Sequence, residues 1–533
     1  MLLRSSCQIE SELNRVKKFH CRDCLKDILK YLQDDDYVDV MGISGLRRTG
    51  KTTLMYQAMN ELSEEERKKA LNIFVYNNDM TQDIVDTIEK MSRQGYKYVF
   101  IDEVTRAEDF IYNASMYADV NARLDRVKIV LTGTDSLKLN RSSQNELFDR
   151  IRSVRTTHMP YREWVRVSNK NKIDDYLRFS GIFDKTWMPE IEGKNEGFAN
   201  ADAAGRYVAT AIGMNIQNTL RHEGYEDSFG GLRNLLRTGE LISAIQRVVQ
   251  DNNHDFGLDV LASVFRSRDF SIARDSLARS RDPERRSKLL KQLNIGPIIE
   301  KLRRDLNIIN PEESIVKLED RHVKEIEEYL KNLEVIVEAP RKSLIDLPNL
   351  PVKRLSSQPG LRYAQAHALL QAVVENPQFQ KAAQRDKVLS TDRIMSAAIG
   401  AMLEDAVMLD TLYASDNLQV FKYRVDSSDV PGVEYDMVLR DPSTNNCTVI
   451  EIKHTHTKDD SQLKAFRNKL FNEKFESEVG KICNKIVLYG GEYDKTYDYI
   501  YYENFEKWLK YLDNGTEYAI DKILSSKNIS IDI

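Results

Sequence analysis

The stretch that decides the fold runs from Gly45 to Thr52 and reads Gly-Leu-Arg-Arg-Thr-Gly-Lys-Thr. It matches the pattern G-x-x-x-x-G-K-[ST] at every defined position. An apolar run, Val38–Ile43, precedes it, and a helix-forming run, Thr53–Leu62, follows it. This order predicts a strand, a glycine-rich loop and a helix, which is the arrangement of a phosphate-binding loop.

The residue types in this loop fit the chemistry of a nucleotide site. Gly45 and Gly50 let backbone N–H groups approach phosphate oxygens, and the positive end of the following helix adds to the attraction. Lys51 would reach the β- and γ-phosphates, and the Thr52 hydroxyl would ligate Mg²⁺. The predicted residues for binding ATP are Gly45, Arg47, Arg48, Thr49, Gly50, Lys51, Thr52 and Thr53.

A second element, Tyr98–Glu103, is an apolar strand that ends in two carboxylates. On a neighbouring parallel strand, Asp102 would hold Mg²⁺ through water, and Glu103 would orient or deprotonate the attacking water. The alternative is that both carboxylates simply end a buried strand in solvent. Because the glycine-rich loop lies earlier in the same chain, the sequence favours nucleotide hydrolysis.

A third strand, Val127–Leu131, runs into a polar stretch at 132–136. Thr134 is predicted to read the γ-phosphate, and Thr132 and Ser136 stay open as alternatives. Farther along, Arg150 is predicted to be an arginine finger that stabilises charge in the transition state. If Arg150 acts on its own chain, a monomer suffices, whereas action on a neighbouring chain requires a homo-oligomer.

Strands and helices alternate up to about residue 164. Helices are predicted at 51–62 and 81–94, and strands at 72–76 and at the positions given above. This alternation implies parallel strands joined by crossover helices, hence an open α/β sheet. Ligands of such sheets bind beyond the carboxyl ends of the strands.

Composition limits the class of protein. The 533 residues are 41% hydrophobic and 30% charged, which is typical of a folded chain. Lys and Arg number 78 against 83 Asp and Glu, so a uniformly basic coat for nucleic acid is excluded. No stretch approaches the roughly 18 apolar residues of a membrane span, and charges interrupt residues 1–18. We therefore expect a cytoplasmic protein without membrane contact.

The five cysteines are too few and too scattered to stabilise the chain as disulfides, which also fits a reducing compartment. Cys21 and Cys24 form one C-x-x-C in a predicted helix over His20–Gln33. A structural zinc site needs two more ligands at comparable spacing, and none is nearby. The spacing therefore favours ordinary packing over metal or redox chemistry.

The rest of the chain is predicted to contain two further domains. After an ATPase domain at 1–164, residues 165–355 are mostly helical, and four prolines between 340 and 359 indicate an extended connector. Within 266–304 twelve Lys or Arg stand against five Asp or Glu, which indicates either a solvated face or a surface that contacts phosphates or a partner. Residues 356–533 contain strands again.

A predicted hairpin in the last domain carries a second group of chemical residues. Val433–Leu439 and Cys447–Lys453 read as strands joined by a turn-rich loop. A turn centred between residues 443 and 444 would place Asp436 directly across from Glu451, with Lys453 on the same face. Two carboxylates that hold one or two Mg²⁺ ions, with an ammonium beside them, suit hydrolysis of a phosphodiester. The alternative is an exposed cross-strand salt bridge.

These motifs together resemble a large group of bacterial and archaeal AAA-like ATPases. The resemblance rests on the glycine-rich loop with its basic pair Arg47 and Arg48, the Asp-Glu strand end, the Thr-Gly-Thr strand end, Phe-Asp-Arg ending at Arg150, and Pro-Tyr-Arg-Glu-Trp at 160–164. Such proteins carry a helical, winged-helix segment and then a domain related to PD-(D/E)XK nucleases. The Asp436-x14-Glu451-x-Lys453 spacing is similar to that of the nuclease motif, and Glu404 lies on an apolar helix (396–412) where the family has a metal-facing Glu.

The sequence therefore predicts an α/β protein with three parts. These are a parallel-sheet P-loop NTPase domain, a helical middle and a restriction-endonuclease-like domain that engages DNA. Whether the last domain cuts DNA stays open. One alternative is a nucleotide-switched signalling ATPase whose nuclease-like module is inactive, and another is a motor on nucleic acid, for which no helicase motif is present.

Overall fold

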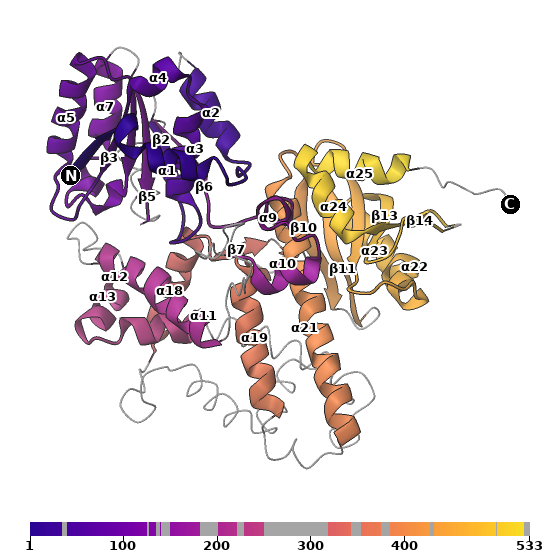
Figure 1. Ribbon diagram of the computed structural model, residues 1–533. Helices are drawn as coiled ribbons and strands as arrows, with labels where there is room; N and C mark the ends of the chain where they lie inside the picture. Colours follow the sequence, from indigo (N-terminus) through magenta and orange to yellow (C-terminus); the bar gives the residue numbers. More distant parts are fainter. Residues whose placement is uncertain are drawn as a thin grey trace.

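The structure is a computed structural model that describes residues 1–34, 40–124, 127–134, 139, 150–181, 201–220, 229–249, 318–339, 341–342, 353–374, 384–426, 431–496 and 498–526. Figure 1 shows an N-terminal α/β unit, a helical region beside it and a C-terminal α/β unit. The basic stretch 266–304 and the alternative Ser136 lie outside the described residues.

The N-terminal unit is built on a six-stranded sheet in the order β1-β3-β4-β5-β2-β6. The five strands from β2 to β6 are mutually parallel, and β1 pairs antiparallel with β3. This arrangement confirms the predicted parallel α/β sheet. The strands are β1 (Leu2–Ser5), β2 (Val40–Ser44), β3 (Ala70–Phe74), β4 (Tyr98–Asp102), β5 (Lys128–Gly133) and β6 (Ile151–Arg155).

Two details of this sheet differ from the prediction. The strand that carries Asp102 is not adjacent to the strand before the glycine-rich loop, because β5 lies between β4 and β2. The edge strands β1 and β6 were not expected from the sequence. Each is short and carries polar residues, since Arg4 lies in β1 and Arg152 in β6, so neither gives the continuous apolar signal of a central strand.

Helices cover both faces of the N-terminal sheet. One apolar core joins α1, α2 and α3 to the sheet, and a second joins α5, α6 and α7 to the other face. The predicted helix over 20–33 starts later than expected. Cys21 precedes it, and Cys24 is its N-cap. The helices are α1 (Glu10–Val16), α2 (Leu25–Gln33), α3 (Lys51–Glu61), α4 (Glu64–Lys68), α5 (Thr81–Arg93), α6 (Phe110–Asn113) and α7 (Ser115–Arg123).

The middle of the chain is helical where it is described, which agrees with the predicted pattern. Its core is formed by α11, the π-helix that follows it, α12, α13 and α18, with part of α19. A two-stranded antiparallel sheet, β7 (Ile336–Ala339) with β9 (Lys353–Ser356), adjoins these helices. A winged-helix arrangement stays a prediction. The helices are α11 (Ala201–Tyr207), the π-helix η3 (Val208–Gly213), α12 (Met214–Leu220), α13 (Gly230–Arg237), α18 (Asp320–Asn332) and α19 (Pro359–Val374).

The C-terminal unit contains a seven-stranded mixed sheet in the order β14-β15-β13-β12-β11-β10-β8. Strand β11 pairs antiparallel with both β10 and β12, whereas β12, β13 and β15 are parallel. The strands are β8 (Arg341–Lys342), β10 (Gln419–Asp426), β11 (Pro431–Arg440), β12 (Asn446–Ile452), β13 (Lys481–Tyr489), β14 (Asp494–Lys495) and β15 (Ile500–Asn504).

The register of the β11–β12 hairpin agrees with the predicted one. Met437 pairs with Ile450 and Arg440 with Cys447, which centres the turn between residues 443 and 444. Extension of the same register by one residue places Asp436 across from Glu451. The single helix expected over 462–479 is instead a 3₁₀ turn and two short helices, η5 (Asp460–Leu463), α22 (Lys464–Arg467) and α23 (Lys469–Glu478).

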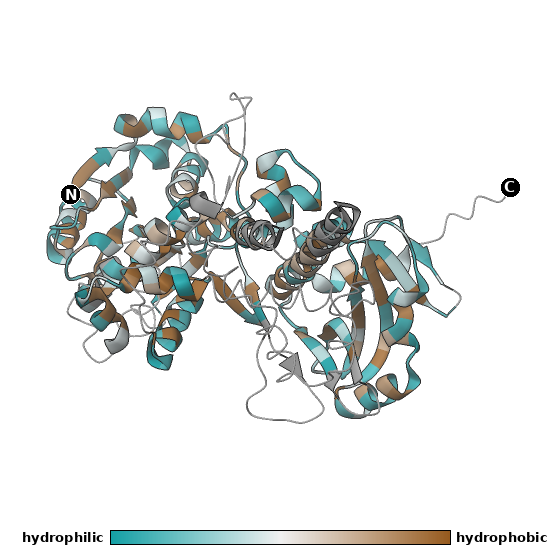
Figure 2. Ribbon diagram, turned by 90° about the horizontal axis from the view of Figure 1, so that it is seen from below, coloured by the Kyte–Doolittle hydropathy of each residue, from teal (hydrophilic) through white to brown (hydrophobic). Residues whose placement is uncertain are grey.

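Helices also cover both faces of this sheet. One face packs against α21 (Gln384–Tyr413), α24 (Phe505–Tyr511) and α25 (Thr516–Ser525), and the other against α22 and α23. Figure 2 shows the corresponding concentration of hydrophobic residues on the strands. Among the residues that the structure describes, none of the helices has the length and apolarity that crossing a bilayer requires.

The two helices that follow the N-terminal sheet belong to the core of the C-terminal unit. Trp164 in α9 (Tyr161–Ser168) and Tyr176 in α10 (Ile173–Phe179) pack in the same cluster as Leu403 and Trp508. The chain therefore enters the C-terminal core before it builds the helical middle. The division into domains at 164 and 355 stays a prediction.

Candidate functional site

The glycine-rich loop joins the carboxyl end of β2 to the first turn of α3. Gly45 has φ +150° and Gly50 has φ +88°, values that L side chains rarely adopt. A Cβ atom on Gly45 would lie 2.2 Å from Thr156 Oγ1. Both glycines of the motif are thus required by the shape of the loop, and Gly45 also by the close approach of Thr156.

Lys51 folds back over this loop. Its ammonium donates hydrogen bonds to Gly45 O and Leu46 O, each at 2.8 Å. The side chain is buried, and burial lowers the pKa of Lys51 to about 8. Arg47 and Arg48 are exposed at the tip of the loop, and Thr53 follows in the first turn of α3.

The predicted magnesium residues lie together. Thr52 Oγ1 is 3.2 Å from Asp102 Oδ2, and Thr132 Oγ1 donates to Asp102 Oδ1 at 2.5 Å. Asp102 is only 4% exposed, and burial raises its pKa. The Thr52 hydroxyl and the buried Asp102 carboxylate both offer oxygen ligands, which suit Mg²⁺. The side-chain hydrogen bonds that Asp102 accepts come from the hydroxyls of Thr52 and Thr132.

Glu103 and Thr134 also meet. Thr134 Oγ1 donates to Glu103 Oε1 at 2.7 Å, and Arg106 Nε lies 3.6 Å from the other carboxylate oxygen. Glu103 has φ +61°, a left-handed conformation that is uncommon outside glycine. The strand end therefore turns the Glu103 side chain toward the end of β5, where Thr134 follows.

The helical middle contacts this edge of the sheet, which the sequence did not indicate. Tyr207 in α11 donates through its hydroxyl to Arg47 O at 3.2 Å, and Asn215 in α12 donates to Thr134 O at 2.6 Å. Leu46, at the loop itself, is fully buried in the core of the middle helices. No motif marks these residues, because the contacts join segments about 80 and 160 positions apart in the chain.

Arg150 does not lie at this site. Its carbonyl accepts the Val40 N–H at the amino end of β2, and its side chain pairs with Asp119 at 2.7 Å near the surface. The parallel pairing of β2 with β6 separates this end of the sheet from the loop by roughly 13 Å along the strand. A finger role for Arg150 on the site of its own chain therefore has no support in this geometry.

The second predicted group, in the C-terminal hairpin, also comes together. Lys453 Nζ lies 2.8 Å from Asp436 Oδ2 and 2.7 Å from Glu451 Oε2. Asp436 additionally accepts the Ile452 N–H at 2.9 Å. Glu451 Oε1 is buried and has no hydrogen-bond partner.

A residue that the sequence analysis missed, Lys422 on β10, lies inside this group. Its ammonium is 3.0 Å from Glu434, 3.7 Å from Glu404 and 3.9 Å from Asp436. Lys422 is buried, and although burial opposes its charge, the three carboxylates raise its pKa above the ordinary value. The period of two in β10 could have indicated the position of Lys422, because it places Lys422 on the same face of the strand as the apolar Val420.

The charged groups of this cluster shift one another's pKa values. Burial raises the pKa of Asp436, but Lys453 and Lys422 outweigh it and lower the pKa to about 2. Burial and the neighbouring Asp436 raise the pKa of Glu451. Among the described residues, no three His, Cys, Asp or Glu side chains are arranged to hold a metal ion. The predicted ligands Glu404, Asp436 and Glu451 each lie close to Lys422 or Lys453, and their role as metal ligands stays a prediction.

Two histidines that follow Lys453 have hydrogen-bond partners, and Cys24 has an unreactive environment. His454 contacts Asp174 at 2.8 Å, and His456 contacts Gly490 O at 2.7 Å. Burial raises the pKa of the Cys24 thiol to about 12, which disfavours the thiolate that metal or redox chemistry needs.

Comparison with protein families agrees with the first site. Residues 38–165 match the family model described as an AAA domain. This part of the chain, with its glycine-rich loop on a parallel sheet, is therefore an AAA-like P-loop ATPase domain, a class that binds and hydrolyses ATP. The match does not extend to the middle or the C-terminal unit. None of the curated proteins compared with the chain matches it.

Three solved structures are similar over larger parts of the chain. The Walker-type ATPase PABY2304 of Pyrococcus abyssi is 13% identical, covers 64% of this chain and 95% of its own, and gives a TM-score of 0.28. C. elegans PCH-2 is 14% identical with coverages of 37% and 62% and a TM-score of 0.22. The S. cerevisiae Hsp104-ADP complex is 10% identical with coverages of 89% and 66% and a TM-score of 0.26. At such low scores, nothing further is inferred from them.

Proposed function

We propose that the protein is a Mg²⁺-dependent ATPase that uses the site at the carboxyl edge of its N-terminal sheet. The observation that carries the proposal is the convergence of the Thr52 hydroxyl and Asp102 at 3.2 Å beside a loop that ends in Lys51. The two residues come from elements 50 positions apart and meet at the edge where ligands of parallel sheets bind.

Each residue then has a role set by its position. Lys51 and the N–H groups of residues 45–52 would bind the phosphates, because an ammonium that donates only to backbone carbonyls can exchange these for phosphate oxygens. Thr52 and Asp102 would hold Mg²⁺, which offsets the charge that develops on the phosphates. Glu103 would orient or deprotonate the attacking water.

Thr134 would act on Glu103 as well as on the γ-phosphate. In the structure its hydroxyl donates to Glu103, so the carboxylate is engaged by the end of β5. A γ-phosphate oxygen is a competing acceptor for this hydroxyl, and its arrival would release Glu103 toward water. A bound nucleoside triphosphate would therefore release Glu103, whereas a diphosphate, which lacks the γ-phosphate, would not.

Phosphate release and calorimetry on the full chain test the ATPase proposal. Wild-type protein should bind ATP with Mg²⁺, and hydrolysis should stop when the metal is chelated. Asp102→Asn should weaken the dependence on Mg²⁺ and lower the rate, whereas Glu473→Gln on the exposed face of α23 serves as a control. Absence of ATP binding by folded wild-type protein would overturn the proposal.

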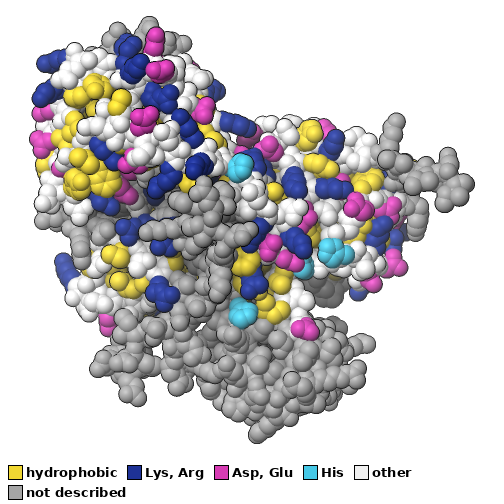
Figure 3. All heavy atoms as spheres, viewed as in Figure 1, with side chains coloured by type: hydrophobic (Ala, Val, Ile, Leu, Met, Phe, Trp, Pro, Cys, Tyr) yellow, Lys and Arg dark blue, Asp and Glu magenta, His cyan; other side chains and the backbone are white. Residues whose placement is uncertain are grey.

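For the C-terminal unit, a nuclease-like module that recognises DNA without cutting it is the better of the two predicted alternatives. The order α21, three antiparallel strands, α23 and the parallel strand β13 supports a nuclease-like arrangement. Lys422 argues against cleavage, because it places a second ammonium group among the carboxylates that would bind the metal. Basic and acidic side chains are interspersed on the face seen in Figure 3, so DNA contacts would be local.

Incubation with plasmid DNA separates the two alternatives. Wild-type protein with Mg²⁺ or Mn²⁺, with and without ATP, should retain DNA in a gel-shift assay and leave it uncut. Metal-dependent cleavage that Asp436→Ala abolishes would establish the nuclease instead. Lys51→Ala, tested beside these, shows whether binding of DNA depends on nucleotide.

A further inference from the structure

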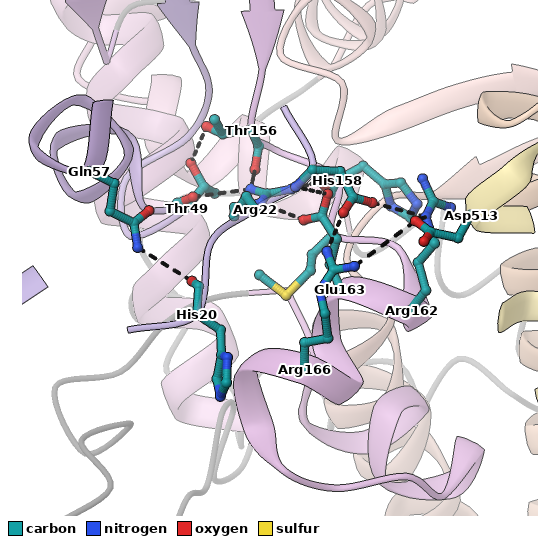
Figure 4. Close-up of polar contacts among 12 residues, drawn as sticks. His20, Arg22, Thr49, Gln57, Thr156, His158, Arg162, Glu163, Arg166 and Asp513 are labelled. Carbon is teal, nitrogen blue, oxygen red and sulfur yellow. Dashed lines mark hydrogen bonds and ion pairs between the residues drawn. The ribbon is translucent and has the colours of Figure 1, made fainter. Parts of the chain in front are cut away.

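A buried arginine lies behind the glycine-rich loop. Arg22 is 6% exposed, and its guanidinium donates to Thr49 O at 3.2 Å, Thr156 O at 2.7 Å and His158 O at 2.5 Å. Its Nε donates to Glu163 Oε2 at 2.7 Å. Figure 4 shows this side chain between the loop and the segment that leaves the N-terminal sheet. No role proposed above uses it.

The chemistry of this contact requires arginine. A buried charge is costly unless it is paired and its donors are satisfied, and here one carboxylate and three carbonyls do both. The planar guanidinium presents donors in fixed directions, so the carbonyls that accept from it are held in fixed directions too. A lysine ammonium would keep the charge without this geometry.

The contact with Thr49 determines the orientation of a peptide group in the loop. In a planar trans peptide the C=O and the following N–H point in opposite directions. Because Thr49 O faces Arg22, the N–H of Gly50 points away from Arg22. Thr49 is held further by its hydroxyl, which lies 2.8 Å from both Leu46 O and Thr156 Oγ1.

The other contacts of Arg22 hold the connecting segment of residues 156–163. This segment is bonded to the C-terminal unit through Asp410 on α21, which is fully buried. His158 Nε2 lies 2.8 Å from Asp410 Oδ1, and the Tyr161 N–H donates to Asp410 Oδ2 at 2.8 Å. Helix α21 also carries Glu404 of the carboxylate cluster.

A second set of ion pairs flanks this connection. Asp23, next to Arg22, pairs with Arg162 at 2.9 Å and also with Arg166, both on α9. Arg162 lies 3.5 Å from Asp513 of the C-terminal unit. Figure 4 shows Arg162, Arg166 and Asp513 beside the Arg22 contacts.

We propose that Arg22 is a positioning residue that couples phosphate binding in the glycine-rich loop to the docking of residues 156–163 on α21. The inference rests on the proposed function, since ATP is the ligand of the loop. Arg22 orients the Gly50 N–H toward the phosphates and holds the connecting segment with the same guanidinium. A change of loop shape on binding ATP is then transmitted to His158 and Asp410, and the coupling is reciprocal.

Three conservative variants and one matched control test the coupling. Arg22→Lys keeps the positive charge, and Glu163→Gln keeps the shape of the side chain that pairs with Arg22. Asp410→Asn removes the charge of the carboxylate that contacts His158. Arg166→Gln is the control, because it removes a neighbouring ion pair that does not touch the loop. Circular dichroism and thermal melting establish that each variant is folded, and Asp410→Asn carries the test if Arg22→Lys does not fold.

The expected results separate positioning from general stability. Arg22→Lys should raise the Kd and KM for ATP about tenfold with a smaller change in kcat, and Asp410→Asn should raise Kd in the same direction, an effect in the usual range of coupling between sites. In wild-type protein, ATP should slow hydrogen exchange in peptides covering 403–413, and Arg22→Lys should lose this response. In a double-mutant cycle, the effects of Arg22→Lys and Asp410→Asn should not add.

Contrary outcomes are equally distinct. Wild-type protein that binds no ATP overturns both this inference and the proposed function. Wild-type protein that binds and hydrolyses ATP, while Arg22→Lys and Asp410→Asn bind it unchanged or no worse than Arg166→Gln, overturns the coupling and leaves the ATPase intact.

Discussion

The glycine-rich loop and the carboxylate cluster of the C-terminal hairpin use similar residues in opposite ways. Both place lysine near buried carboxylates that lie on strands. Among the residues that the structure describes, Lys51 donates to backbone carbonyls, and the side-chain donors to Asp102 are the hydroxyls of Thr52 and Thr132. In the hairpin, Lys453 bonds both Asp436 and Glu451 directly.

The pKa values of the two groups reflect this difference. Burial lowers the pKa of Lys51 and raises that of Asp102, so both charged forms are disfavoured before a ligand arrives. In the cluster, the lysines lower the pKa of Asp436 to about 2 despite its burial, and the carboxylates raise the pKa of Lys453. We therefore expect the first site to be stabilised by a bound metal and anion, whereas in the second site the lysines already stabilise the charge of Asp436.

Substitution of Lys51 and of Lys453 should give the largest difference between the two sites. Lys51→Ala should lower kcat/KM for ATP by about 10²–10³-fold, because a cation that stabilises developing charge in a buried site is lost. Lys453→Ala should leave hydrolysis of ATP unchanged. Steady-state phosphate release measures both, and an equal loss in the two variants would mean that the sites act as one.

Glu103→Gln should separate binding from chemistry within the first site. The amide keeps the shape and the contact with Thr134 but cannot accept a proton, so kcat should fall about 10²-fold while KM changes little. Glu434→Gln, a matched change next to Lys422, serves as the control. Unchanged kcat in Glu103→Gln would remove this residue from the chemistry.

The two buried aspartates should respond in opposite directions to loss of charge. Asp436→Asn removes the carboxylate that contacts both lysines. Because the pKa of Asp436 is lowered to about 2 in the folded chain, its charge stabilises the fold, and its loss should destabilise the C-terminal unit by about 3 kcal/mol. Asp102 has a raised pKa when folded, so above that pKa its ionisation opposes folding, and Asp102→Asn should stabilise the nucleotide-free N-terminal unit.

Hydrogen exchange during urea unfolding measures this contrast, because it reports each unit separately in a chain that is not expected to unfold in two states. Glu473→Gln on α23 is the control. Destabilisation of the N-terminal unit by Asp102→Asn without nucleotide would contradict the reading of Asp102 as an uncompensated charge.

The pH dependence of ATP binding should follow Lys51. Its pKa is lowered to about 8 by burial, and a bound phosphate favours the protonated form, so the pKa rises in the complex. Above pH 8 binding should therefore take up a proton, and affinity should fall by about tenfold per pH unit. Calorimetry in two buffers of different ionisation enthalpy measures the uptake, and affinity that stays constant to pH 9.5 would contradict the prediction.

The sequence was sufficient to predict the features that local patterns encode. The loop at 45–52, the strand end at Asp102 and the hairpin register of Asp436 and Glu451 all follow from spacing over a few residues and from the period of two in strands. These features were found because the residues that act together are also close in the chain or lie at matched positions of one hairpin.

The remaining features depend on distant segments that meet only in the folded chain. Lys422 comes from the next strand, Arg22 contacts residues more than 130 positions later, and Tyr207 reaches the loop from the helical middle. The position of Arg150 could not be predicted for a related reason. Its spacing placed it near a sheet but did not say at which end, which depends on the parallel pairing of β6 with β2.

Substitution of Arg150 should give the smallest effect. It also tests whether the protein acts as a homo-oligomer. Its ion pair with Asp119 is about half exposed on both sides, so its loss should cost at most about 1 kcal/mol of stability. Because Arg150 lies at the opposite end of the sheet from the loop, Arg150→Ala should not change hydrolysis per molecule in dilute protein.

A neighbouring chain would change this expectation. If Arg150 reaches the site of a second copy, specific activity should rise with protein concentration in the wild type and stay flat in Arg150→Ala. Asp119→Asn, which breaks the same ion pair but leaves the guanidinium, should keep the rise. Hydrolysis that does not depend on concentration in any of the three proteins would exclude Arg150 as a finger in either arrangement.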